Sequence, residues 1–220
     1  MSQRQKAIIA VICIGSIILI DQIVKIYVKT HFYLGESYDV FSWFHIRFVE
    51  NNGMAFGIEL FNKIFLTIFR IVAVGFIGYY LHLIIKKNYS VGYILCVATL
   101  LAGAFGNIID CVFYGIIFDS GHPIATMFPE QGYAPLFYGR VVDMLYFPLI
   151  DTYLPSWMPV VGGSHFTFFD PVFNIADAAI CVSIFCAVLF QRKYIIEDFK
   201  DKKEEKAETK ENNETETKTE

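Results

Sequence analysis

Four long apolar runs dominate this 220-residue sequence and limit what it can fold into. A helix needs about 20 consecutive apolar residues to cross the roughly 30 Å hydrocarbon layer of a bilayer. Hydrophobic residues make up 55% of the chain, a share that few water-soluble domains reach. The sequence therefore predicts an all-α membrane protein. Its four transmembrane helices are expected at residues 7–28, 64–85, 91–112 and 172–191.

Basic residues flank the apolar runs in a pattern that predicts their orientation. They precede the first run, separate the second from the third, and follow the fourth, as Arg4, Lys6, Lys86, Lys87, Arg192 and Lys193. The positive-inside rule places such groups in the cytoplasm. With four spans, both termini are expected there. The connections 29–63 and 113–171 then lie on the outer side.

The longer outer connection differs in composition from the rest of the chain. All seven prolines lie between Pro123 and Pro171, so this loop cannot be one continuous helix. The same stretch is rich in Phe and Tyr, which are common at membrane–water interfaces. We therefore expect the outer loops to form a small β-containing platform on the extracytoplasmic surface.

The last 24 residues form a separate region. Residues 197–220 contain ten acids and six lysines but almost no aliphatic side chains. Such a segment cannot bury enough apolar surface to fold alone. The sequence thus predicts a membrane domain over residues 1–196 and a disordered, charged cytoplasmic tail over residues 197–220.

Polar residues inside the predicted spans gather toward one side of the membrane. Given the orientation, every carboxylate within the spans lies in the outer half of its helix, at Asp21, Asp110 and Asp177, and Asn107 and Asn174 lie there too. A carboxylate within a bilayer is costly and usually marks a functional site. Asp143 and the "ENNGMAF" stretch at 50–56 belong to the outer loops, so they can join the same site.

The spacing of these residues adds detail to the site. Asn107 and Asp110 are three residues apart, as are Asn174 and Asp177, so each pair shares a helix face. We expect the amide of each pair to hold its neighbouring carboxylate by a hydrogen bond. Structural roles are also open, because Asp177 can cap its helix and Asp21 can pair with Lys25 four residues later.

Two carboxylates brought together can catalyse hydrolysis. At close range it is costly for both carboxyl groups to be ionised at once, so one keeps its proton while the other acts as a base toward water. Proton-coupled transport by a small membrane carrier is the main alternative, and a non-catalytic assembly factor is another. The five cysteines include no CxxC pair, which argues against a zinc site or a disulfide framework.

Five short motifs, taken together, resemble lipoprotein signal peptidase (signal peptidase II), a bacterial family of membrane aspartyl proteases. They occur in the order of that family, each near the outer end of a predicted span or in an outer loop. They are "DQIVK" at 21–25, "NNGMAFG" at 51–57, "GAFGNIID" at 103–110, "VVDM" at 141–144 and "FNIADAAI" at 173–180.

The resemblance implies a function and a set of site residues. The enzyme would remove signal peptides from diacylglyceryl-modified prolipoproteins, cutting before the lipidated cysteine, with Asp143 and Asp177 as the catalytic aspartates. The residues that would bind substrate or support this pair are Asp21, Asn51, Gly53, Asn107, Asp110 and Asn174. It also implies a monomer in the bacterial inner membrane, with its active site on the extracytoplasmic side. No metal, organic cofactor or nucleic acid is implied.

Two features depart from the family pattern. The family usually has Arg after G-N-x-x-D, whereas this chain has Cys111 there. Arg70 or Arg140 is our hypothesis for a replacement. The loop 113–171 also carries two stretches that look like insertions, at 118–135 and 148–165.

Overall fold

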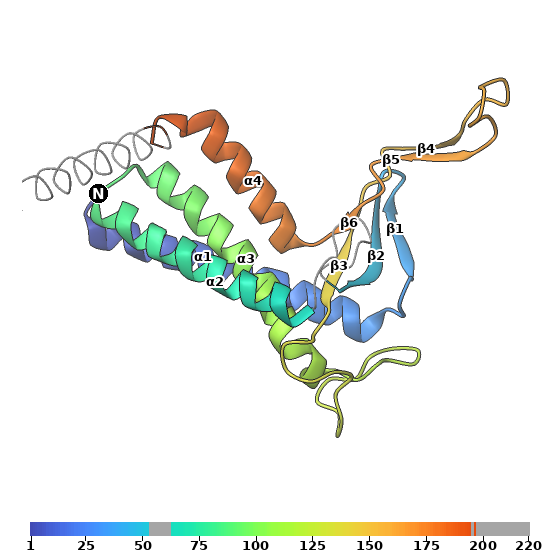
Figure 1. Ribbon diagram of the computed structural model, residues 1–220, viewed down its shortest axis with the longest axis horizontal. Helices are drawn as coiled ribbons and strands as arrows, with labels where there is room; N and C mark the ends of the chain where they lie inside the picture. Colours follow the sequence, from blue (N-terminus) through green and yellow to red (C-terminus); the bar gives the residue numbers. More distant parts are fainter. Residues whose placement is uncertain (53–62, 195, 197–220) are drawn as a thin grey trace, which may run out of the picture.

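The computed structural model describes residues 1–52, 63–194 and 196, and its helices lie side by side (Figure 1). The predicted tail and Gly53 fall outside the described residues. The helices are α1 (Gln3–His31), α2 (Lys63–Lys86), α3 (Val91–Ile117) and α4 (Ile175–Phe190). In the described part of the chain, α1, α2 and α3 are long and apolar enough to cross a membrane, and α4 is a shorter apolar helix.

Two helices differ in extent from the predicted spans. The fourth span was placed at 172–191, but Val172 and Phe173 form a strand, and the helix begins only after Asn174 caps it. The third span was ended at 112, but α3 continues to Ile117. Backbone N–H groups of the following loop satisfy its last carbonyl groups; for example, Ala134 N donates to Gly115 O over 3.0 Å. Carbonyls at a helix end need such partners.

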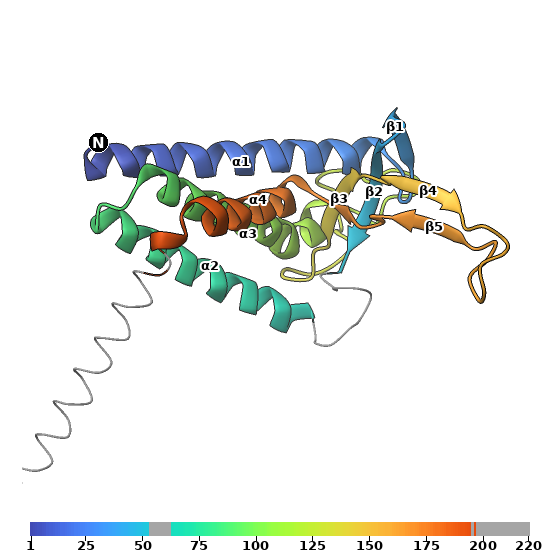
Figure 2. The ribbon, with the colours of Figure 1, turned by 90° about the horizontal axis from the view of Figure 1, so that it is seen from above.

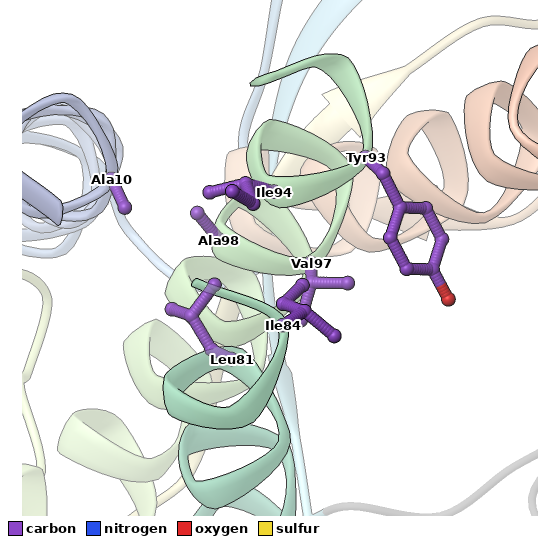
Figure 3. Packing of buried hydrophobic residues seen from close by; sticks show 7 residues of the cluster. All are labelled: Ala10, Leu81, Ile84, Tyr93, Ile94, Val97 and Ala98. Carbon is purple, nitrogen blue, oxygen red and sulfur yellow. The ribbon is translucent and has the colours of Figure 1, made fainter. Parts of the chain in front are cut away.

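Helix α3 is the centre of the bundle and contacts each of the other three helices. Figure 2 shows α1 on one side of it and α2 on the other. Near the N-terminal end of the molecule, an apolar cluster joins α1, α2 and α3 (Figure 3). It consists of Ala10, Leu81, Ile84, Tyr93, Ile94, Val97 and Ala98.

A β-sheet lies at the end of the bundle away from the N-terminus (Figure 1). Both predicted outer connections contribute strands to it, so the expected β-structure is present. Its antiparallel strands, in spatial order, are β1 (Ser37–Phe41), β2 (Phe44–Asn51), β3 (Val141–Tyr146) and β6 (Val172–Phe173). A separate hairpin of β4 (Ile150–Tyr153) and β5 (His165–Phe168) projects beyond it and accounts for most of the second insertion.

A second apolar cluster fixes the sheet to the helices. It contains side chains from α1, α3, β2, β3 and the 118–135 loop: Val28, Phe48, Tyr114, Phe118, Ala125, Val142 and Met144. Beside it, buried Lys29 pairs with Glu50, and Glu50 also accepts a hydrogen bond from Arg140 at 2.9 Å. Strand β3, which carries Asp143, is therefore held against α1 and α3.

Gly103 allows α3 and α4 to pack closely. A Cβ at this position would lie 2.3 Å from the backbone oxygen of Ala176. We expect Gly103→Ala to lower the free energy of unfolding by about 1–3 kcal/mol, because the helices must move apart. Thermal melts in detergent measure this. Gly75→Ala is the control, since nothing lies within 4 Å of its added Cβ, and an equal loss there would contradict the explanation.

Candidate active site

Two aspartates from distant parts of the chain, Asp143 on β3 and Asp177 on α4, meet through asparagine side chains. Asn174 Nδ2 donates to Asp143 Oδ1 over 2.7 Å. Asn107 Nδ2 donates to Asp177 Oδ1, also over 2.7 Å. The two amides are themselves linked, because Asn174 Nδ2 lies 3.1 Å from Asn107 Oδ1. Asp143 and Asp177, called the dyad below, are thus bridged by two amides.

Asn174 also begins helix α4. Its Oδ1 accepts the backbone N–H of Asp177 over 2.9 Å, and its own backbone N–H donates to Asp177 Oδ2 over 3.3 Å. This reciprocal arrangement is a capping box, which satisfies two N–H groups at a helix start. Asp177 therefore takes part in the capping of α4 as the third residue of the helix, while Asn174 is the N-cap. This arrangement leaves Asp177 Oδ1 directed at Asn107.

The expected pairing of each amide with its own neighbour was wrong in detail. The amide of Asn107 bonds Asp177 rather than Asp110, and the side chain of Asn174 donates to Asp143. Asp110 has other partners, because Lys25 and Gln22 from α1 both donate to it. Spacing along one helix could not reveal these contacts between helices.

A second group of polar residues, the acid–lysine cluster (buried Asp21, Lys25 and Asp110 with half-buried Gln22), lies behind the dyad. Lys25 Nζ contacts Asp21 Oδ2 at 2.9 Å and Asp110 Oδ2 at 2.8 Å. The predicted pair of Asp21 with Lys25 is therefore present. Gln22 Nε2 donates to Asp110 Oδ1 over 3.0 Å, which helps fix that carboxylate.

Both acids of this cluster also hold the backbone next to the dyad. Asp21 Oδ1 accepts the backbone N–H of Ala176 over 2.9 Å. Asp110 Oδ2 accepts the backbone N–H of Val142 over 3.3 Å. Ala176 and Val142 each precede a dyad aspartate. Asp21 and Asp110 therefore support the dyad through the main chain.

The surroundings of Asp143 favour its protonated form. Burial, followed by the nearby charge of Asp177, raises the pKa of Asp143 to about 7. Hydrogen bonds from Asn174 and Asn51, together with the charge of Lys25, oppose this pKa shift. Near neutral pH the site can thus hold one proton on Asp143, as hydrolysis by paired carboxylates requires.

This raised pKa predicts a pH-dependent stability. The folded protein binds a proton at Asp143 that the unfolded chain has lost above about pH 4. The associated stabilisation is complete below about pH 4 and is lost as the pH rises through about 7. We expect Asp143→Asn to melt at a higher temperature than wild type at pH 8, with little difference at pH 4. Melting temperatures that differ equally at both pH values would contradict the assigned pKa.

The remaining predicted site residue within the described chain is Asn51, which forms a hydrogen bond with the side chain of Asp143. It ends β2 and pairs with Val141 of β3, two residues before Asp143. Gly53, from the same motif, lies outside the described residues. The structure therefore places Asn51 within hydrogen-bonding distance of Asp143, and its role there stays a prediction.

The structure places Arg70 next to Cys111, where the family usually has arginine. Arg70 Nη1 lies 3.1 Å from Cys111 Sγ, so the guanidinium of Arg70, on α2, contacts the cysteine that departs from the family pattern. Arg140 instead pairs with Glu50 and lies over the ring of Tyr133. Of the two candidates for compensation, Arg70 has the supporting contact.

Gln22 was not singled out from the sequence, and Lys25 was considered only as a partner of Asp21. Both belong to the "DQIVK" motif, and a lysine and a glutamine within an apolar run are unusual. That combination was a usable signal. Among residues 1–52, 63–194 and 196, His, Cys, Asp and Glu do not gather in groups of three that could hold a metal ion.

Comparisons with known proteins agree with this geometry. The family model for signal peptidase (SPase) II matches residues 13–192. A lipoprotein signal peptidase of Porphyromonas gingivalis is 53% identical over 171 residues, covering 76% of this chain and 75% of that protein. One from Amoebophilus asiaticus is 37% identical over 185 residues, covering 81% of this chain and 75% of its own.

A solved structure described as a bacterial membrane enzyme has a similar fold. It aligns with a TM-score of 0.58 and 22% sequence identity, over 84% of this chain and 87% of its own. The family match extends from α1 to just beyond the end of α4 and contains both dyad aspartates and all their described hydrogen-bond partners. The chain therefore belongs to the signal peptidase II family.

Proposed function

We propose that this chain is an aspartyl endopeptidase that removes signal peptides from diacylglyceryl-modified prolipoproteins, cutting before the lipidated cysteine. The observation that carries the proposal is the convergence of Asp143 and Asp177 on linked amides in a member of the signal peptidase II family. The proton-coupled transporter considered from the sequence is not favoured by the family match.

The different environments of the two aspartates support separate roles. Asp177 is partly exposed and can take a proton from water, while the more deeply buried Asp143 holds a proton near neutral pH. Water oxygen adds to the scissile carbonyl carbon as Asp177 accepts its proton and Asp143 protonates the carbonyl oxygen. The C–N bond then breaks, the amine takes the proton from Asp177, and a hydroxyl proton returns to Asp143.

We place the dyad near the outer surface of the bacterial inner membrane, with four spans and both termini in the cytoplasm. The basic residues at the N-terminal end of the bundle, opposite the sheet, support this orientation (Figure 1). Helix α4 has 16 residues and is about 24 Å long, somewhat less than the hydrocarbon thickness. A short fourth span would place Asn174 and Asp177 slightly below the membrane surface.

An apolar cleft between α2 and α4, with α3 as its floor, is a suitable place for the signal helix. Its volume is about 690 Å³, and its lining includes Phe76, Tyr80, Val97, Leu100, Ile184 and Val188. Along α4, the lining residues Ser183 and Val188 lie about 9 and 17 Å inward of Asp177. The apolar core of a signal peptide has 7–15 residues, or about 10–22 Å of helix, which matches this depth.

The proposal also assigns the partners. We assign the substrate and the bilayer as partners and take the chain to act as a monomer, since the described residues of the proposed site need no second chain to meet. The lipid on the cysteine would anchor the scissile bond at the outer leaflet beside the dyad. Holding the bond there raises the effective concentration of the reacting groups.

Cleavage of a defined substrate tests the proposed function. The purified full-length chain in detergent should cut a diacylglyceryl-modified prolipoprotein, and mass spectrometry should place the cut immediately before the modified cysteine. The matched control is the same substrate with that cysteine replaced by serine, which cannot be lipidated and should remain uncut. Equal cleavage of both substrates, or a cut elsewhere, would contradict the proposal.

A further inference from the structure

Lys25 has a contact that its ion pairs do not require. In addition to Asp21 and Asp110, its Nζ donates to Asn107 Oδ1 over 2.8 Å. The three N–H groups of the ammonium therefore have three separate acceptors. Lys25 is 0% exposed, so water does not compete for these hydrogen bonds. Two of the acceptors balance its charge, and the third is an amide that touches the dyad.

This third contact fixes the direction of an amide. A lysine ammonium can only donate hydrogen bonds, so the atom of Asn107 that faces Lys25 must be the carbonyl oxygen. The NH₂ group of Asn107 is then directed toward Asp177 Oδ1, at 2.7 Å. Without a donor-only partner, an asparagine amide can turn over and exchange its oxygen and nitrogen.

The second amide is fixed in a similar way by the backbone. The N–H of Asp177 donates to Asn174 Oδ1, so the NH₂ of Asn174 is directed toward Asp143 and Asn107. That direction depends on helix α4 alone. Asn107 Oδ1 accepts from both Lys25 and Asn174, so these two donors together set the direction of the Asn107 amide, and Lys25 makes the shorter of the two contacts.

We propose that Lys25 is a positioning residue for the reaction: together with Asn174, it orients the Asn107 amide so that Asp177 receives an N–H donor and is thereby held as the base. This inference rests on the proposed peptidase function and assigns the direction of its proton transfers. If the amide turned over, its carbonyl oxygen would face Asp177 Oδ1. Two oxygens in contact require a proton between them, and Asp177 would then no longer be ready to accept one from water.

The charged groups around the dyad set the design of the test. Asp21 and Lys25 come from α1, Asp110 from α3 and Asp143 from β3, while Glu50 of β2 pairs with Lys29 and Arg140. Removing Lys25 alone would leave two buried carboxylates without their cation. The variant Lys25→Met/Asp110→Asn removes one charge of each sign, so the net charge of the cluster is unchanged.

Two comparison variants separate the effect of the N–H donor at position 25 from the effect of its positive charge. Lys25→Gln/Asp110→Asn restores an N–H donor at position 25 without restoring the charge. Lys29→Met/Glu50→Gln removes the neighbouring buried lysine of α1 together with its acid, and neither residue contacts the dyad amides in the described hydrogen-bond network. All three are made in the full-length chain. Each is assayed for melting temperature, kcat, KM and the pH profile of kcat/KM on the lipidated prolipoprotein.

We expect the Met variant to lose kcat about 10- to 100-fold with KM within about twofold of wild type. The acidic limb of its pH profile of kcat/KM should move to higher pH by about one to two units. A shift of that size corresponds to the free energy of one hydrogen bond to a charged group. The Gln variant, whose amide can present either an N–H or its oxygen to Asn107, should recover part of kcat and move the limb part of the way back to its wild-type position. The Lys29→Met/Glu50→Gln variant should lose stability while keeping the wild-type limb.

The outcomes that would overturn the inference are distinct. A Met variant that melts lower but keeps the wild-type limb and kcat would show that Lys25 only holds the helices together. If that variant does not fold, the Gln variant decides: a folded Gln variant whose limb shifts by the full one to two units contradicts the inference, and one with a smaller shift supports it. Failure of wild type to cut the substrate would instead overturn the proposed function.

Discussion

Asp143→Asn and Asp177→Asn are each expected to lower kcat for prolipoprotein cleavage by about 1,000-fold or more while the protein stays folded. Asparagine has nearly the shape of aspartate but can neither accept the proton from water nor supply one to the carbonyl oxygen. Both carboxylates already bond to amides, so each site can accept a polar replacement of the same size. Single-turnover cleavage in detergent, with thermal melts alongside, measures the effect.

The matched control for the dyad variants is Asp151→Asn. Asp151 is an exposed residue of β4 that contacts Thr167 and His165 within the hairpin. Its replacement should leave kcat within about twofold, since surface changes away from a site have small effects. If Asp143→Asn or Asp177→Asn kept substantial activity, the dyad would be misassigned, and Asp110 or Asp21 would become the next candidate.

The second large effect is expected at Asn174, which serves both the helix and the site. Asn174→Ala removes the cap of α4 and the hydrogen bonds to Asp143 and Asn107. We expect a loss of about 0.5–2 kcal/mol in stability, as for other N-cap replacements. We also expect kcat to fall about 100-fold or more, because both catalytic groups lose their alignment.

Ser90→Ala separates these two consequences. Ser90 caps α3 by accepting the backbone N–H of Tyr93 over 3.2 Å, at the opposite end of the bundle from the dyad. It should lose a similar amount of stability without a change in kcat. Equal losses of kcat in Ser90→Ala and Asn174→Ala would mean that general loosening of the bundle, rather than the dyad contacts, explains the Asn174 result.

The sequence predicted those parts of the molecule that depend on local pattern. The apolar runs predicted the ends of α1 and α2 to within a few residues. The prolines excluded one long helix between Pro123 and Pro171. Motif order brought Asp143 and Asp177 together, although they lie on different elements. The carboxylates of the predicted spans lie close together because a carboxylate buried in a membrane needs partners, and few arrangements of the helices supply them.

The parts that were not predicted depend on contacts between elements. The i, i+3 spacing suggested that Asn107 would bond Asp110, but Lys25 and Gln22 of α1 already occupy that carboxylate. The start of α4 was misplaced because Val172 and Phe173 are as apolar as the helix they precede, and pairing with β3 makes them a strand. Neither the cross-pairing nor the strand leaves a local trace in the sequence.

The position of Asn174 couples catalysis to a folding step. Because one side chain both starts α4 and contacts each half of the active site, unwinding of the first helical turn would disassemble the dyad at the same moment. By linkage, a molecule that binds both aspartates must also suppress that unwinding. A bound inhibitor should therefore slow hydrogen exchange at the backbone amides of Ala176, Asp177 and Ala178. The exchange rate at the start of α4 then measures how much of the protein has an inhibitor bound at the dyad.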